Sequence, residues 1–250
     1  MAVGTPADAR RALLERLIDH APTFPPARLP TDEALAEDRR ARASEEVWLL
    51  GRLVWPASRL GELDGYDSRV PISAVLDGQV PVPGTGTCLE ALESRWPEVP
   101  DFRGEVFVEL PLDDDLERNL EHVRAAGALA KVRCGGERTP PPAELARFVR
   151  ACAATGVAFK ASAGLHQPVR RGEQHGFLNL AAAVLFPQEA DAALEDDDPV
   201  AFALDDDRFA WAGFHANAVE IRRMRRERFR SFGSCSFAEP VEDLRALGIL

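Results

Sequence analysis

Five segments in the middle of the chain decide the fold: EVFVEL (105–110), LERNLEHVRAA (116–126), LAKVRC (129–134), PAELARFVRACAAT (142–155) and VAFKAS (157–162). The first, third and fifth are short and rich in β-branched or aromatic residues, as buried strands are. The second and fourth place apolar residues at helical spacing, and a glycine follows each of them. Strands that alternate with helices of about a dozen residues predict right-handed βαβ units and a parallel sheet.

The N-terminal part adds a helical segment and further strands. Residues 1–46 are expected to be helical because leucines recur there at helical spacing. Segments 47–55 and 70–77 are expected to be strands, and 81–87 is a loop rich in Gly and Pro. Residues 88–95 are expected to form a short helix.

The C-terminal third shows a weaker pattern. The apolar segment 177–186 is consistent with a buried helix or with a strand that runs into one. A strand is expected at 209–214, a helix at 221–230, a last strand at 230–237 and a closing helix at 239–247.

Seven or eight strand candidates thus follow one another without a linker. A single β/α barrel takes about 250 residues, and the chain has 250. The sequence therefore predicts an α/β fold, a single (β/α)8 TIM-type barrel over 47–250 with an N-terminal helical extension over 1–46. An open doubly wound sheet is the alternative.

The composition narrows the function classes. The formal charge of −11 argues against a nucleic-acid partner, and no stretch approaches the roughly 20 apolar residues of a membrane span. Four scattered cysteines and the lack of an apolar leader indicate a reduced, cytoplasmic protein. The expected partner is a small anionic metabolite, and a homo-oligomer is compatible with the sequence.

Only two of the 30 basic residues are lysines, Lys131 and Lys160. A surface lysine can be replaced by arginine at little cost, whereas an amine nucleophile cannot, because guanidinium stays protonated and forms no imine. Both lysines occur in predicted strands near the carboxyl end, where the functional residues of a β/α barrel lie. We therefore expect both to be functional.

The strand pattern suggests a role for each lysine. Lys131 and Arg133 share a strand face and are expected to lower the pKa of Lys160, which would form a Schiff base. The alternative is that Lys160 pairs with a carboxylate such as Glu109 or Asp77 and holds the barrel together.

Two motifs resemble a known family. ALAKVRCGG (128–136) with AELARFVRACAATGVAFKASAG (143–164) resembles deoxyribose-phosphate aldolases, whose Schiff-base lysine matches Lys160 in KASAG. RFRSFGSCSF (228–237) resembles the family's final turn, which holds the substrate phosphate. The resemblance implies a TIM barrel, an imine-forming lysine and a phosphate turn at the following residues: Gly233, Ser234 and Ser236.

The chain departs from that family elsewhere. It has no lysine after Lys160 and no Gly-Gly-Val-Arg motif, and residues 165–227 do not match. Lys131 would have to replace the family's second late lysine, and the deoxyribose substrate is not implied. Over its whole length the chain resembles bacterial β/α-barrel proteins that have no assigned activity.

Further candidates complete the predicted site. His166 follows the KASAG strand and Glu109 ends an earlier one, so both are candidate general acids or bases. Candidate substrate-binding residues are the following: Arg52, Asp77, Arg133 and Ser162. The histidine spacing matches no zinc pattern, and no nucleotide-binding motif is present, so no metal or cofactor is expected.

The sequence therefore predicts an aldolase-like lyase that forms a Schiff base with a small, phosphorylated carbonyl compound. Two alternatives remain open. One is an isomerase or decarboxylase that stabilises an enolate without an imine, and the other is a barrel that binds an anion without catalysis.

Overall fold

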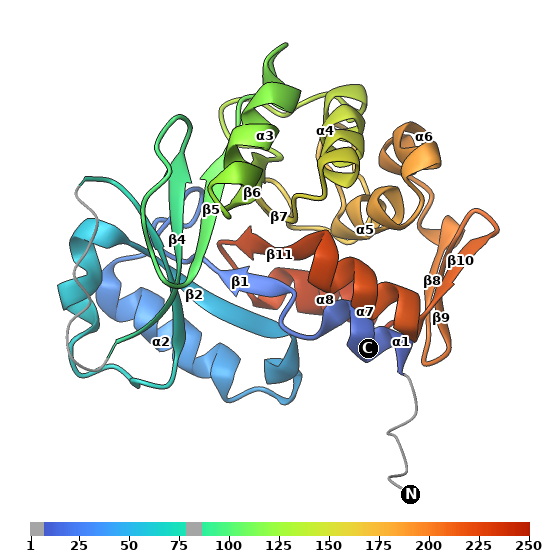
Figure 1. Cartoon of the computed structure of the whole chain (residues 1–250). Helices are drawn as coiled ribbons and strands as arrows, with labels where there is room; N and C mark the ends of the chain where they lie inside the picture. Colours follow the sequence, from blue (N-terminus) through green and yellow to red (C-terminus); the bar gives the residue numbers. More distant parts are fainter. Residues whose placement is uncertain (1–7, 79–86) are drawn as a thin grey trace, which may run out of the picture.

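A computed structural model describes residues 8–78 and 87–250, so positions 81–86 of the expected Gly/Pro loop lie outside the described residues. Eight parallel strands form a closed barrel in the order β1-β11-β7-β6-β5-β4-β3-β2 (Figure 1). The predicted α/β TIM-type barrel is confirmed. The strand bounds are β1 Ile18–His20, β2 Leu50–Pro56, β3 Pro71–Val75, β4 Cys88–Arg95, β5 Glu105–Glu109, β6 Leu129–Arg133, β7 Phe159–Ser162 and β11 Phe229–Ser234.

The middle of the chain folds as its pattern predicts. Helix α3 (Leu116–Ala125) joins β5 to β6, and α4 (Pro142–Thr155) joins β6 to β7. The buried face of α4 includes Leu145, Phe148 and Val149, which recur at helical spacing. Each helix is followed by a glycine at positive φ, a conformation that costs glycine little.

Two barrel strands lie where helix was expected. Strand β1 interrupts 1–46, between α1 (Ala9–Leu14) and α2 (Thr31–Arg42), and β4 replaces the helix expected at 88–95. The β4 sequence CLEALESR consists largely of helix-forming residues. However, β3 and β5 pair with its backbone on either side, and such tertiary pairing overrides a weak local preference.

The helical layer around the barrel is uneven. The 3-10 helix η2 (Ala57–Leu63) joins β2 to β3, and the described loop 96–104 joins β4 to β5 without any helix. By contrast, α3, α4 and α5 (Phe177–Leu185) pack side by side in sequence order (Figure 1). None of the helices in the described residues is both long and apolar enough to cross a membrane.

A small antiparallel sheet interrupts the β/α pattern before the last strand. It contains β8 (Phe202–Leu204), β9 (Arg208–Trp211) and β10 (Phe214–Asn217), and it follows α6 (Ala190–Glu195). The strand expected at 209–214 is in fact divided by a turn in which Ala212 and Gly213 have φ of 46° and 88°. The last helices are α7 (Ala218–Glu227) and α8 (Ala238–Ala246).

Apolar side chains pack between the barrel wall and the helices, whereas the barrel axis contains charge. Asp19, Glu93, Lys131 and Lys160 are each at most 5% exposed. A buried charge is costly unless it is paired, and these four residues come from four different strands. The barrel axis is therefore the candidate functional site.

Candidate active site

The register of the strands brings the two lysines side by side. Lys131 on β6 lies opposite Lys160 on β7, and Glu109 on β5 lies opposite Lys131. Two residues further toward the carboxyl ends, Arg133 lies opposite Ser162. Because alternate residues of a strand share a face, this register gathers basic side chains and one carboxylate near the carboxyl ends of the strands.

Lys160 is fully buried between two carboxylates. Its Nζ donates to Asp19 Oδ2 at 2.7 Å and to Glu93 Oε1 at 2.6 Å. Burial alone would lower the pKa of Lys160, but Asp19 and Glu93 raise it above the ordinary value. The direction is opposite to the one expected from the neighbouring cations, because two carboxylates accept hydrogen bonds from Nζ.

Glu93 joins the two lysines. Its second oxygen, Oε2, lies 3.0 Å from Lys131 Nζ, and its Oε1 also accepts from Ser73 Oγ at 2.7 Å. Burial would raise the pKa of Glu93, yet Lys160 and Lys131 hold it well below its ordinary range. Glu93 is therefore ionised at neutral pH and links the lysines into one network.

The network becomes more accessible toward the mouth formed by the carboxyl ends of the strands. Lys131 Nζ lies 3.1 Å from Glu109 Oε2, and Arg133 Nε donates to Glu109 Oε1 at 3.1 Å. Burial would raise the pKa of Glu109, but Lys131 and Arg133 lower it. The side chain of Arg133 is 41% exposed, so this guanidinium is the part of the network that a ligand meets first.

Asp19 is held in place by several donors besides Lys160. Ser231 Oγ donates to its Oδ2 at 2.7 Å, and the backbone N–H of Arg52 donates to its Oδ1 at 2.9 Å. A Cβ at Gly51 would lie only 2.4 Å from that Oδ1. Gly51 thus allows β2 to approach the carboxylate closely enough to bind it.

Sequence reasoning missed both carboxylates that hold Lys160, because Asp19 and Glu93 lie in segments expected to be helical. A signal was present, since each is a single acidic residue that follows two apolar ones, in Leu17-Ile18-Asp19 and Ala91-Leu92-Glu93. The alternative pairing of Lys160 with Glu109 or Asp77 named the correct interaction but the wrong carboxylates.

Two predicted substrate-binding residues are already engaged by other groups of the protein. The guanidinium of Arg52 donates to Glu90 and Glu105, which lie in the amino-terminal parts of β4 and β5. Asp77 is exposed after β3 and accepts from the backbone N–H and the hydroxyl of Ser58 at 2.8 and 2.6 Å. Both residues therefore form local structural contacts.

His166 lies beside the mouth and in contact with another cluster. Its Nδ1 is 3.3 Å from Glu239 Oε2 and 4.0 Å from Cys235 Sγ. Burial raises the pKa of the Cys235 thiol. Within the described part of the chain, no hydrogen bond or ion pair joins His166 to Lys160, so any exchange of protons between them would need the substrate or water.

The predicted phosphate turn leads from β11 into α8. Ser234 Oγ donates to the backbone oxygen of Ser236 at 2.6 Å, and Ser236 Oγ accepts from the backbone N–H of Glu239 at 3.3 Å. These hydroxyls therefore support their own turn. A Cβ at Gly233 would meet nothing within 4 Å, so Gly233 leaves open space beside this turn.

The glycines of the two resembling motifs have a packing role. A Cβ at Gly135 would lie 2.8 Å from the Cα of Gly164, and one at Gly164 would lie 2.9 Å from the backbone oxygen of Cys134. The loops after β6 and β7 therefore approach each other backbone to backbone. This contact sets the spacing of the two lysine-bearing strands, whose Lys131 and Lys160 are neighbours.

The arrangement is a charge-balanced chain that runs from the middle of the barrel to its mouth. It contains three carboxylates and three cations in alternation, in the order Asp19, Lys160, Glu93, Lys131, Glu109 and Arg133. Such a chain can move protons between neighbours and can bind an anionic or carbonyl oxygen. Among the described residues, no group of three or more His, Cys, Asp or Glu side chains has the geometry of a metal site.

Comparisons with known proteins add no family to these observations: no family model matches the chain, and no curated protein matches it.

Proposed function

We propose that the protein is an aldolase-like lyase in which Lys160 forms a Schiff base with a small carbonyl compound. The observation that carries this proposal is the position of Lys160 Nζ in the barrel axis, 2.6 and 2.7 Å from two carboxylates. Imine formation requires several proton transfers at one nitrogen, and carboxylates within hydrogen-bond distance can perform them. The resemblance of KASAG to the aldolase motif supports the same lysine.

The first step frees the amine. The ammonium of Lys160 gives one proton to Asp19 or Glu93, and the lone pair of Nζ then attacks the carbonyl carbon. A proton moves from nitrogen to oxygen, the carboxylic acid returns its proton to the new hydroxyl, and water leaves. The sum is one ammonium and one carbonyl compound giving one iminium and one water, with both carboxylates ionised at the end.

The iminium then acts as an electron sink for the adjacent carbon–carbon bond. When a base removes the proton from the hydroxyl of the leaving fragment, that fragment departs as an aldehyde and the bonding electrons move toward Nζ, which gives an enamine. Glu109 is suited to the role of base because its lowered pKa keeps it ionised. Lys131 and Arg133 supply the positive charge for anionic oxygens.

In this proposal, a phosphate group on the substrate would bind at the mouth. Gly233 leaves open space there, and the backbone N–H groups at the start of α8 are an environment that favours anions. Arg133 adds a partly exposed guanidinium. We therefore place the phosphate end of the substrate between the turn at Gly233 and the side chain of Arg133.

Reductive trapping tests this function. The protein is incubated with aldehydes, ketones and sugar phosphates, reduced with borohydride and measured by intact mass. We expect the mass gain of one reduced adduct, mapped to Lys160 in a peptide digest and lost in Lys160→Met. A Lys131→Arg variant has Lys160 as its only lysine and should retain the adduct. An adduct that persists in folded Lys160→Met, or no adduct with any carbonyl compound, would refute the imine.

An imine-independent isomerase or decarboxylase is the second candidate, and the raised pKa of Lys160 favours it. A lysine that stays protonated can stabilise the negative charge of an enolate without any covalent bond. In that case borohydride traps nothing, while solvent deuterium enters the carbon next to the carbonyl group of a turned-over substrate.

Binding without catalysis is distinguished by Lys160→Arg. This variant keeps a cation between Asp19 and Glu93 but has no amine that can form an imine. A binding barrel should retain its affinity for the anion, whereas an imine enzyme should lose all turnover.

A further inference from the structure

One cavity lies at the end of the barrel opposite the mouth. It has a volume of about 480 Å³, within the roughly 300–1,000 Å³ typical of small-molecule sites. Leu129 begins β6, Ala158 directly precedes β7, and Arg230 lies near the start of β11. The cavity is therefore formed by the amino ends of three neighbouring strands and by the helix ends that precede them.

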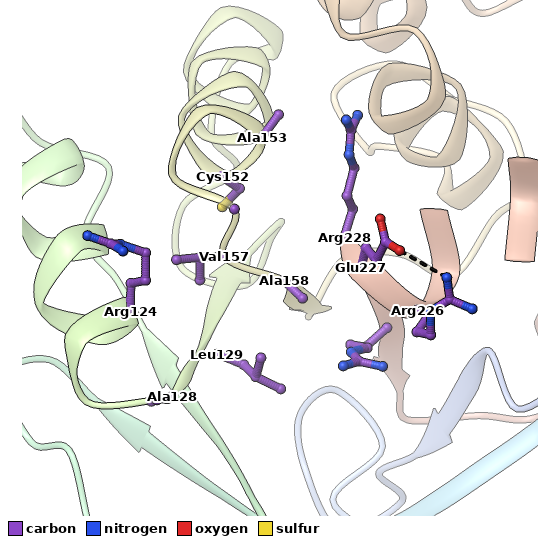
Figure 2. A pocket seen from close by; sticks show the side chains of 13 residues that line it. Arg124, Ala128, Leu129, Cys152, Ala153, Val157, Ala158, Arg226, Glu227 and Arg228 are labelled. Carbon is purple, nitrogen blue, oxygen red and sulfur yellow. Dashed lines mark hydrogen bonds and ion pairs between the residues drawn. The ribbon is translucent and has the colours of Figure 1, made fainter. Parts of the chain in front are cut away.

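One side of this cavity is mostly apolar, with Arg124 of α3 at its edge, and the other side is charged (Figure 2). Figure 2 shows Cys152 and Ala153 on α4, with Val157 and Ala158 below them, on the side facing Glu227 and Arg228. The apolar wall suits a hydrocarbon or ring portion of a ligand, because contact with it removes apolar surface from water. The charged wall suits a polar group of the same molecule.

The charge of the cavity is positive in a protein whose net charge is −11. Four arginines and one glutamate line it: Arg124, Arg226, Arg228, Arg230 and Glu227. The glutamate is already engaged by Arg226 Nη2 at 2.9 Å and by Arg223 Nε at 2.9 Å (Figure 2 shows the first pair). The lining therefore has three net positive charges.

Helix dipoles oppose an anion here, but by less than the arginines attract it. The C-termini of α3, α4 and α7 reach the cavity, and each has a partial charge of roughly −0.5. Together they amount to about −1.5, against three net positive charges on side chains. The balance remains positive.

Two arginines of the cavity retain hydrogen-bonding capacity. Arg230 Nε is buried and has no hydrogen-bond partner in the described part of the chain, and its nearest carboxylate contact is 3.8 Å, from Nη2 to Glu105. Arg228 donates to the backbone oxygen of Val184 at 3.2 Å and forms no ion pair with any described residue. An unpaired buried donor is rare in folded proteins, and an anionic ligand would satisfy it.

We infer that this cavity is a second ligand site, distinct from the mouth, for a small organic phosphate with an apolar body. The phosphate would accept from Arg230, the nearby Arg228 would add positive charge, and the apolar body would pack on Val157, Ala158 and Leu129. The inference is independent of the proposed lyase function, because none of these residues belongs to the network around Lys160.

Phenyl phosphate is the probe for this site. Inorganic phosphate and phenol are the control ligands, which carry only the anionic or only the apolar part. Calorimetric titration of the full chain should show saturable binding of phenyl phosphate, weaker binding of inorganic phosphate and weakest binding of phenol. We expect Ala153→Glu to raise the Kd for phenyl phosphate by about tenfold or more, and Arg228→Gln by about fivefold.

Matched controls keep the test specific. Ala154→Glu adds the same charge one residue further along α4 and outside the cavity lining, and Arg222→Gln removes an exposed arginine of α7 that is also outside it. Both should bind phenyl phosphate as the wild type does. Arg133→Ala should remove only the separate binding that the proposed site at the mouth would contribute, and binding in the cavity should remain. The inference is overturned if binding is absent, if it survives both cavity variants, or if Arg133→Ala abolishes all binding.

Discussion

The two ends of the barrel hold charge in opposite ways. In the axis and toward the mouth, Asp19, Glu93, Lys131 and Lys160 are at most 5% exposed, and each has an oppositely charged partner within 3.0 Å. In the cavity at the amino ends, arginines outnumber carboxylates, and Arg230 Nε has no partner among the described residues. The charges of the axis are therefore paired with one another, whereas the cavity has positive charges without a partner in the part of the chain that the structure describes.

This difference predicts which residues contribute to folding stability and which contribute to ligand binding. A buried ion network is strongly disturbed when one member is removed, because the partner is left as an uncompensated buried charge. An exposed excess of charge contributes little to folding and is available to a ligand. Changes in the axis should therefore mainly cost stability, and changes in the cavity should mainly cost binding.

The largest effect is expected for Lys160→Met. The substitution leaves Asp19 and Glu93 buried without their shared cation, so the free energy of unfolding should fall by about 3–5 kcal/mol. Urea denaturation followed by circular dichroism measures this loss. Lys160→Met combined with Glu93→Gln removes one of the stranded charges and should recover part of it. A single variant as stable as the wild type would contradict the closed network.

Arg225 lies at the amino end of the barrel, like the cavity arginines, but its guanidinium is bound by other groups of the protein. Its guanidinium donates to backbone oxygens of Leu13, Phe229 and Arg230, and burial lowers its pKa to about 10. We expect Arg225→Met to lower the free energy of unfolding by about 1–3 kcal/mol, because these carbonyl groups lose their donor. Arg222→Met on the same helix is the control and should have almost no effect in the same denaturation experiment.

The pH dependence of the free energy of unfolding tests whether Glu93 and Lys160 in the barrel axis are both ionised. Glu93 has a pKa below its ordinary 4.5, so its contribution is present above pH 4.5 and is lost as the pH falls through the lower, folded value. Lys160 has a pKa above its ordinary 10.5, so its contribution is present below pH 10.5 and is lost as the pH rises through the higher, folded value.

The stability difference between the wild type and the Lys160→Met/Glu93→Gln variant should therefore be constant from about pH 5 to pH 10. It should decrease outside that window. Denaturant titrations at several pH values measure it, and a marked slope near neutral pH would show that the two groups are not ionised together in the folded protein.

The smallest effect on stability is expected for Arg228→Gln. The variant should change the free energy of unfolding by no more than about 0.5 kcal/mol, although it weakens the binding of phenyl phosphate. Thermal unfolding with and without the probe measures both properties in one experiment. A large loss of stability without the probe would show that Arg228 contributes to folding. It would contradict the view that charges at the amino end of the barrel contribute mainly to binding.

The sequence predicted the half of the barrel whose local preferences agree with its final structure. In 105–162, β-branched strands alternate with amphipathic helices, and each segment adopts the structure that its own pattern favours. β1 is only three residues long, and β4 consists largely of helix formers. Their conformation is determined by neighbouring strands, and a local pattern cannot show that pairing.

The same limit explains which part of the site was found. Lys131 and Lys160 were identified from composition, a property that does not depend on the fold. Asp19 and Glu93 are close to Lys160 only because the barrel closes, and both lie in the two segments whose strands were missed. Arg52 and Asp77 were proposed as substrate-binding residues from their strands alone, whereas their side chains bind nearby partners.

The pairing of β1 with β11 also means that the site can be completed only after β11 has been made. Asp19 receives its hydrogen bond from Ser231, 212 positions later, and pairs in register with Gly233 on β11. A ribosome-bound chain that has not yet produced β11 therefore lacks the strand that joins β1 to β7. Until then Lys160 has no fixed Asp19 beside it, so the buried ion network around Lys160 is incomplete in a chain that lacks β11. Closure of the barrel and maturation of the site are the same step.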